Sequence, residues 1–260
     1  MMSSVELSYE VFGAEEAPPL VILHGFLASS RNWRQIAKRL SESFCVYLPD
    51  QRNHGASPHA ERMDYPSMAD DVLNFLDRLD LASVALLGHS MGGKTAMWFA
   101  LNYPERVTRL MVADIAPVAY QHNFDRMIRA LRDLPLDALK NRKQADDFLA
   151  DAIEDAGFRQ FLLQNLILEE GVYRWRINLD FFQHSAANIV GFPKVDGLLS
   201  FDRETLFIAG EQSSYFRKES VAELFPKNRI EMIANAGHWL HVEQPERFVQ
   251  TVESFCRVPV

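Results

Sequence analysis

The chain of 260 residues contains only two cysteines, Cys45 and Cys256. Two cysteines this far apart do not form the kind of disulfide framework that stabilises small secreted domains. Neither belongs to a Cys-x-x-Cys pair, and no His-Glu-x-x-His segment occurs, so two common metal-binding patterns are missing. We therefore expect buried thiols, and neither a metal ion nor another cofactor.

Long apolar runs and positive charge are also scarce. No run approaches the 18 or so apolar residues that a membrane-spanning helix needs. The 27 Lys and Arg residues are outnumbered by 35 Asp and Glu, which gives a net charge of −8. The first basic residue is Arg31, so the positive start of a secretory signal and the arginines of a transit peptide are missing. A membrane protein and a nucleic-acid-binding protein are disfavoured, and we expect a cytoplasmic protein; no feature indicates its oligomeric state.

What the chain does contain is an alternation of short apolar runs and amphipathic stretches. The runs are rich in Val, Ile and Leu and lie at 20–23, 45–48, 84–87, 110–113, 205–209 and 230–234. Such runs are typical of strands that are buried on both faces. Helix-length segments, such as 33–40, 68–79 and 95–103, lie between them. The pattern predicts an α/β fold with a mostly parallel central sheet and helices on both faces.

The alternation stops between Pro117 and Asp202, where the apolar spacing becomes helical. We expect this segment, 117–202, to be an inserted helical cap, with 1–116 and 203–260 forming the core. Aromatic side chains are spread through the cap. Over the carboxyl edge of a sheet they would line a mostly apolar substrate pocket, and the candidates are Phe124, Trp175, Phe181 and Phe182.

Residues 88–95, Gly-His-Ser-Met-Gly-Gly-Lys-Thr, satisfy two incompatible patterns. As Gly-x-Ser-x-Gly they predict a nucleophile elbow, a sharp strand-to-helix turn that exposes the hydroxyl of Ser90. As Gly-x-x-x-x-Gly-Lys-Thr they predict a phosphate-binding P-loop, with Lys94 on phosphates and Thr95 on magnesium. A P-loop usually follows the first strand of its domain, whereas at least three expected strands precede this segment. The elbow is further favoured because His-Gly-Phe at 24–26 ends an expected strand upstream and Asn-Ala-Gly-His at 235–238 ends one downstream, and an NTPase requires neither. In that interpretation Lys94 and Thr95 are ordinary helix residues.

Four separated segments occur in the order typical of α/β-hydrolases: His-Gly-Phe at 24–26 with Trp33, then 50–57, 88–93 and 235–248. The chain resembles that superfamily along most of its length. Two further segments, Ala-Asp-Ile-Ala-Pro-Val at 113–118 and Gly-Glu-Gln-Ser-Ser-Tyr-Phe at 210–216, are similar to YbfF-type bacterial esterases and their eukaryotic relatives. The resemblance implies the α/β-hydrolase fold and places acyl-CoA thioesters among the candidate substrates.

Ser90 is the expected nucleophile, with a helix-capping serine as the alternative. A serine hydroxyl needs a base within hydrogen-bonding distance, and the sequence offers eight histidines. His238 follows Ala-Gly at an expected strand end and matches the family's catalytic position. His241 is expected at the pocket or the surface of a short helix.

The acid is less obvious. Most α/β-hydrolases carry it after the strand that precedes the histidine's strand, but that position holds Ser213 here, and Glu211 lies too early in the turn. Asp114 ends the strand that follows the nucleophile's helix, and the resemblance to YbfF-type enzymes implies this relocation. The alternative is a buried carboxylate that binds N–H groups of its own loop.

The backbone N–H groups of Phe26 and Met91 are the expected oxyanion-hole donors. Together these residues predict a serine hydrolase in which Ser90 attacks an acyl carbonyl, His238 transfers the proton and Asp114 orients the imidazole. The partner would be a small ester or thioester with an apolar acyl or alcohol part. Two alternatives stay open: a nucleotide-binding P-loop protein, and a ligand receptor that has kept the fold without turnover.

Overall fold

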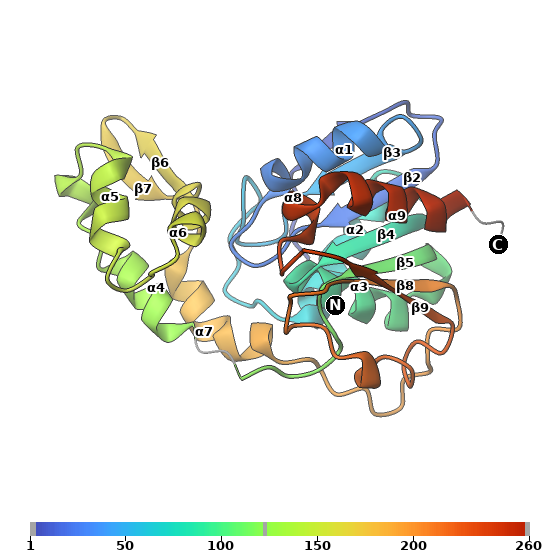
Figure 1. Ribbon diagram of the computed structural model, residues 1–260. Coiled ribbons are helices and arrows are strands. Elements are labelled where there is room, and N and C mark those ends of the chain that lie inside the picture. The colour runs from blue at the N-terminus through green and yellow to red at the C-terminus, as the bar shows by residue number, and fades with distance from the viewer. Residues whose placement is uncertain (1–3, 122–123, 258–260) are drawn as a thin grey trace.

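The computed structural model describes residues 4–121 and 124–257. Within them a seven-stranded sheet has the strand order β1-β3-β2-β4-β5-β8-β9 (Figure 1). Its strands are β1 (Tyr9–Phe12), β2 (Pro19–Leu23), β3 (Cys45–Pro49), β4 (Val84–His89), β5 (Val107–Ala113), β8 (Thr205–Gly210) and β9 (Asn228–Ile233). Only the pairing of β1 with β3 is antiparallel. The predicted mostly parallel sheet is confirmed.

The strands lie where the apolar runs predicted them, and most of those runs are buried from both sides; the run at 230–234 in the edge strand β9 is only partly buried. Every residue of β3, β4 and β8 is buried. The edge strand β1 instead alternates between exposed and half-buried residues, as expected for a strand with one face toward solvent. The sequence 20–23 forms most of β2, which lies beside β4.

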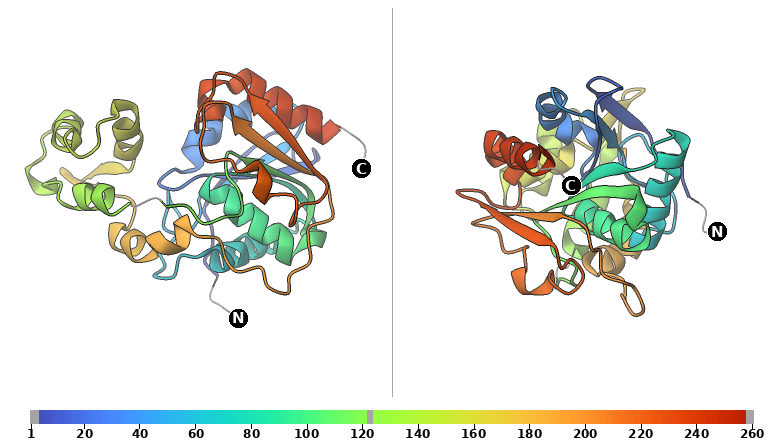
Figure 2. Two further views of the ribbon diagram at one scale, coloured as in Figure 1. Left: turned by 60° about the horizontal axis from the view of Figure 1, so that its bottom comes forward. Right: turned by 90° about the vertical axis from the view of Figure 1, so that its right-hand side faces the viewer.

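Helices cover both faces of this sheet (Figure 2, right). The helices of the core are α1 (Arg34–Leu40), α2 (Tyr65–Arg78), α3 (Met91–Asn102), α8 (Leu240–Glu243) and α9 (Pro245–Arg257). Apolar residues of α2 and α3 form a hydrophobic cluster with one face, and those of α1 and α9 form a cluster with the other. No helix in the described part of the chain is long and apolar enough to cross a membrane.

A second group of elements is inserted between β5 and β8, which pair directly with each other. It consists of α4 (Asp125–Arg132), α5 (Arg142–Leu149), α6 (Ala156–Leu163), β6 (Leu166–Glu169), β7 (Val172–Trp175) and α7 (Leu179–Val190). The group stands beyond the carboxyl ends of the strands (Figure 1), and we refer to it as the cap. Its expected limits, 117 and 202, stay a prediction, and residues 122–123 within them lie outside the described residues.

The cap is not wholly helical, because β6 and β7 form an antiparallel hairpin. Glu170 and Gly171 connect the two strands and both have positive φ, 49° and 83°. Two such residues make the tight turn that matches the twist of paired strands. The strands have four residues each, which is too short for a clear alternation in the sequence.

Lys94 differs from the ordinary helix residue that we expected. Its side chain on α3 is buried, with 1% of the residue exposed. The ammonium group donates to the carbonyl oxygens of Val190 (2.9 Å) and Gly191 (2.5 Å) at the end of α7, and it lies 4.6 Å from the centre of the Tyr120 ring. Because the ammonium group of Lys94 donates to carbonyl oxygens of the cap, it does not have the free, phosphate-facing position of a P-loop lysine.

We expect a Lys94→Met variant to lose a pH dependence of stability. Burial lowers the pKa of Lys94 to about 7, whereas the unfolded chain takes up the proton at about 10.4. The unfolded state therefore binds more protons between these values, and the Lys94 contribution to the free energy of unfolding rises with pH. Between pH 7 and pH 10, the wild type should gain about 3 kcal/mol relative to the variant.

Urea denaturation at both pH values measures this difference. Lys38→Met is the matched control, because Lys38 is exposed on α1. A Lys94→Met curve that runs parallel to the wild-type curve across this pH range would contradict the prediction.

Candidate active site

Ser90 lies between β4 and α3 in a turn that leaves no room for side chains on its glycines. Its φ of 53° is in the left-handed region, which is unfavourable for a residue other than glycine. A Cβ on Gly88 would lie 2.2 Å from the Gly92 carbonyl oxygen, and one on Gly92 would lie 2.3 Å from that of Leu23. These are the features of a nucleophile elbow.

His238 follows β9 and lies within hydrogen-bonding distance of two of the predicted site residues. Its Nδ1 is 2.7 Å from Oδ2 of Asp114 and its Nε2 is 3.1 Å from Oγ of Ser90. A carboxylate only accepts hydrogen bonds, so Nδ1 carries the proton and donates it to Asp114. Nε2 is then free to accept the Ser90 hydroxyl proton, and the three side chains form one continuous relay.

Asp114 directly follows β5 and its side chain is fully buried. Its Oδ1 accepts from the backbone N–H of Gly210 at 3.1 Å, and its Oδ2 accepts from the hydroxyl of Ser213. These partners belong to β8 and its following turn, so the carboxylate does not bind only its own loop. Glu211 accepts from the N–H of Asn235 instead.

Four other histidines lie near the site but in roles that differ from that of His238. Burial lowers the pKa values of His24, His54, His89 and His241, that of His89 to about 3. Nε2 of His89 donates to the carbonyl of His238 at 2.8 Å and so holds the His238 loop. These four imidazoles stay neutral near pH 7 and support the loops around the site.

The structure places His241 away from the expected pocket. Its ring is buried and stacks on Trp33, with ring centroids 4.1 Å apart. Trp33 comes from the segment just before α1, so the pair joins α1 to α8. The short helix turns the side chain of residue 241 inward, which the spacing from His238 did not indicate.

The turn formed by His24, Gly25 and Phe26 lies against the nucleophile. A Cβ on Gly25 would be 3.4 Å from the Cβ of Ser90. Nε2 of His54 accepts from the N–H of Leu27 at 3.1 Å and so fixes the turn from behind. In the described part of the chain, the N–H groups of Phe26 and Met91 have no hydrogen-bond acceptor, which leaves both available to an oxyanion.

The aromatic side chains that we expected in the pocket do not all meet. The ring of Phe26 contacts Phe124 and Phe182, each at a centroid distance of 5.0 Å. Trp175 lies elsewhere in the cap: its indole N–H donates to the carbonyl of Leu131, and it lines an outward hollow beside Arg132. Phe181 is only half-buried, and among the described residues its ring has no contact with that of Phe26. Two of the four rings, those of Phe124 and Phe182, therefore form an apolar wall with Phe26, the residue after Gly25, which lies against Ser90.

Two residues near His238 were not identified from the sequence. Ser213 binds the carboxylate of Asp114, and the ring of Tyr215 stacks on the imidazole of His238 with centroids 4.0 Å apart. An aromatic face stabilises a neighbouring positive charge. Tyr120 connects this turn to the loop after Asp114, because its hydroxyl accepts from the N–H of Ala116 and donates to the carbonyl of Tyr215. The segment 210–216 was the only sequence signal for them.

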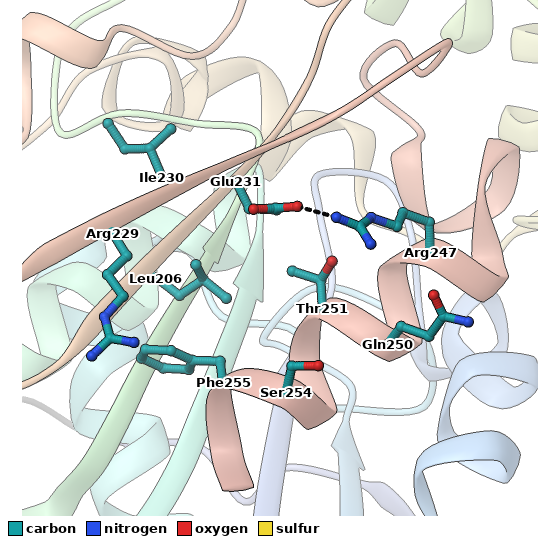
Figure 3. A pocket seen from close by; sticks show the side chains of 9 residues that line it. All are labelled: Leu206, Arg229, Ile230, Glu231, Arg247, Gln250, Thr251, Ser254 and Phe255. Atoms are coloured by element: carbon teal, nitrogen blue, oxygen red, sulfur yellow. Dashed lines mark hydrogen bonds and ion pairs between the residues drawn. The ribbon is translucent and has the colours of Figure 1, made fainter. Parts of the chain in front are cut away.

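A separate hollow of about 390 Å³ lies between β9 and α9 (Figure 3). Arg247 forms an ion pair with Glu231 across it. Leu206 and Arg229, which also line it, lie toward the amino ends of β8 and β9, whereas Ser90 follows the carboxyl end of its strand. The hollow is distinct from the candidate site. Among the described residues, no group of three or more His, Cys, Asp or Glu side chains could hold a metal ion.

Comparison with known proteins identifies the family. The family model described as the alpha/beta hydrolase fold matches residues 18–245. An sn-1-specific diacylglycerol lipase ABHD11 from Xenopus tropicalis is 37% identical over 263 residues, which cover 96% of this chain and 82% of that protein. The esterase YbfF of Escherichia coli strain K12 is 32% identical over 242 residues, 91% of this chain and 92% of that protein.

A solved structure described as a marine microorganism esterase has 41% sequence identity and a TM-score of 0.93, and the match covers 97% of this chain and all of that one. The predicted resemblance to YbfF-type esterases is thus confirmed. The chain belongs to the α/β hydrolase fold family, and these relatives, matched over nearly its whole length, are esterases and lipases.

Proposed function

We propose that the protein is a serine hydrolase that cleaves carboxylic esters, with Ser90 as nucleophile, His238 as general base and Asp114 as the acid that orients it. The observation that carries this proposal is the relay of hydrogen bonds from Ser90 Oγ through His238 to Asp114. The esterase and lipase relatives support the reaction class.

In this mechanism, Nε2 of His238 takes the hydroxyl proton while Oγ of Ser90 bonds to the acyl carbon. Asp114 stabilises the resulting imidazolium. The carbonyl electrons move to the oxygen, which the N–H groups of Phe26 and Met91 stabilise. The intermediate collapses, the C–O bond to the alcohol breaks, and the imidazolium gives its proton to the leaving oxygen. Water then repeats the two steps on the acyl-enzyme and releases the acid.

The substrate would be an ester with an apolar acyl or alcohol part. The rings of Phe26, Phe124 and Phe182 support this, because they gather apolar surface from both the core and the cap at the residue whose N–H is an expected oxyanion donor. An acyl thioester would react by the same steps, with a thiolate as leaving group. The active centre requires no metal or cofactor for this chemistry.

Covalent labelling tests the proposal. A fluorophosphonate probe reacts with an activated serine, so we expect it to label the folded protein once, at the peptide that contains Ser90, and not to label heat-denatured protein. Mass spectrometry locates the adduct. Turnover of p-nitrophenyl esters of increasing acyl length then separates an enzyme from a receptor without turnover. No labelling and no turnover would end the proposal.

Ser213 offers a more graded prediction. Its hydroxyl donates to the buried Asp114 carboxylate, and hydrogen bonds to charged groups are among the stronger ones. A Ser213→Ala variant should lower kcat about tenfold. The loss should fall on kcat and leave KM nearly unchanged, because Ser213 acts through the orientation of the Asp114 carboxylate.

Initial rates at a series of substrate concentrations measure kcat and KM separately. Ser214→Ala is the matched control, since Ser214 is the exposed neighbour in the same turn. Equal kcat values for the two variants would refute a positioning role for Ser213.

A further inference from the structure

A second pocket, of about 280 Å³, lies between the core and the cap and contains three arginines. Arg31 comes from the loop after β2, Arg142 begins α5, and Arg176 follows β7. No acidic residue lines this pocket; its other lining residues are Leu27, Ser29, Asn32, Gln164 and Asn165. On a chain with a net charge of −8, it is a local concentration of positive charge.

The charges in this pocket are not neutralised by the protein. Among the described residues, the guanidinium groups of Arg31 and Arg176 form no ion pair, and Arg142 donates to the carbonyl of Leu163. Burial, Arg31 and Arg142 lower the pKa of Arg176, while Asp50 and Glu169 raise it. Unpaired like charges held together are unfavourable unless an anion joins them.

Neither the Asp50 carboxylate nor the Glu169 carboxylate neutralises the arginines of this pocket. Asp50 is buried, and its oxygens accept from the backbone N–H groups of Ser30 at 2.7 Å and Ala56 at 2.8 Å. Glu169 is exposed at the end of β6. The arginines therefore keep donors for an external anion. Guanidinium groups suit phosphate because their planar N–H pairs match its oxygens.

The pocket adjoins the turn that carries Phe26, one of the two expected oxyanion donors. Leu27, which follows Phe26, forms part of its wall, and the Leu27 carbonyl accepts from Nδ2 of Asn165 at 2.8 Å. Asn32 donates to Gln164 across the boundary between core and cap at 2.9 Å. A ligand bound by the arginines thus lies along the boundary between core and cap, beside the turn that carries the N–H of Phe26.

An apolar hollow of about 440 Å³ lies on the other side of the Asn32–Gln164 hydrogen bond, because both residues line both spaces. Its apolar walls include Phe158, Phe161 and Trp239. Trp239 is the residue next to His238. The boundary between core and cap therefore has one basic and one apolar section, and the apolar section includes the sequence neighbour of His238.

We propose that Arg31, Arg142 and Arg176 bind a phosphate group in the leaving group of the substrate. The preferred substrate class is then an amphipathic ester or thioester, with an apolar acyl chain and a phosphate-bearing alcohol or thiol. This inference rests on the proposed hydrolase function, which it makes more specific.

The test compares two thioesters with the same acyl chain: octanoyl-CoA, which carries phosphates, and octanoyl-N-acetylcysteamine, which carries none. The quantity measured is the kcat/KM for octanoyl-CoA divided by the kcat/KM for octanoyl-N-acetylcysteamine. Arg31→Gln and Arg176→Gln should each lower this ratio about tenfold, and the double variant about a hundredfold. Arg129→Gln, an exposed cap arginine outside the pocket, removes the same charge and should leave the ratio unchanged. An unchanged ratio in the double variant would exclude CoA as the leaving group that the arginines bind.

A lipid could carry the same phosphate. For glycerolipids, the corresponding ratio is the kcat/KM for dihexanoyl phosphatidic acid divided by that for dihexanoylglycerol. The substrate pair whose ratio changes more in the arginine variants identifies the source of the phosphate. Unchanged ratios for both pairs would refute the site.

Binding separates this inference from the hydrolase proposal. Calorimetry of octanoyl-CoA with a Ser90→Ala protein needs no turnover, and adding Arg31→Gln and Arg176→Gln should weaken its Kd about a hundredfold. Turnover that survives Ser90→Ala would refute the hydrolase mechanism alone. A Kd that is unaffected by the arginine substitutions would refute the anion site alone.

Discussion

A Ser90→Ala variant should hydrolyse p-nitrophenyl esters with a kcat about 10⁶-fold below that of the wild type. The hydroxyl of Ser90 is the atom that His238 Nε2 reaches at 3.1 Å, and without it no acyl-enzyme forms. Residual turnover would come from water bound near the oxyanion donors. Initial rates with active-site-titrated enzyme measure the loss.

Because the relay acts as a unit, a Ser90→Ala/His238→Ala double variant should be about as slow as either single variant. Urea denaturation of each variant shows whether the fold is intact. A Ser90→Ala variant that keeps more than about one hundredth of the wild-type kcat would exclude Ser90 as the nucleophile, since removal of a nucleophile from such a relay lowers kcat far more.

The second large effect is expected for Asp114→Asn, which should lower kcat about 10⁴-fold. The carboxylate accepts the Nδ1 proton of His238 at 2.7 Å. An amide that presents its NH₂ group to Nδ1 favours the tautomer with the proton on Nε2, which cannot accept from Ser90. It also withdraws the negative charge that stabilises the imidazolium.

Glu211→Gln is the control for this prediction. Glu211 occupies the turn after β8 and accepts from the N–H of Asn235, but it does not contact His238. Its kcat should stay within a factor of a few of the wild type, since one exposed hydrogen bond is changed. A large loss in Glu211→Gln together with a small loss in Asp114→Asn would move the acid to Glu211 and leave the reaction class unchanged.

The central sheet could be predicted because its strands are encoded locally. A strand buried on both faces requires a continuous apolar run, and runs such as 84–87 and 110–113 are typical of such strands. The elbow could be predicted because its motif is contiguous in the sequence, although the atoms that require its glycines are not all local: a Cβ on Gly88 would meet the Gly92 carbonyl oxygen, and one on Gly92 would meet that of Leu23 on β2.

The cap was harder to predict because its structure depends on contacts between distant segments. The strands β6 and β7 are half-exposed and four residues long, so their hairpin is set by the turn at Glu170 and Gly171 rather than by a pattern. The burial of Lys94 depends on carbonyls almost a hundred residues away. Lysine is almost never fully buried, so the sequence favoured an exposed position.

The candidate site also combines features that the sequence predicts locally with features that depend on distant contacts. Ser90, His238 and Asp114 each follow an expected strand, and parallel strands bring their carboxyl ends to one edge. The inward rotation of His241 onto Trp33 and the outward position of Trp175 depend on how short elements pack. The basic pocket joins arginines from three segments, and no spacing in the sequence connects them.

The direct pairing of β5 with β8 has a consequence for how such proteins diversify. The chain leaves the sheet and returns to it at neighbouring strands, so the cap is joined to the rest of the molecule through two closely placed crossings. An exchange of this insert for that of a relative would leave every hydrogen bond of the sheet ladder in place. Substrate choice can therefore evolve, or be engineered, as a transplantable module while the chemical centre is inherited unchanged.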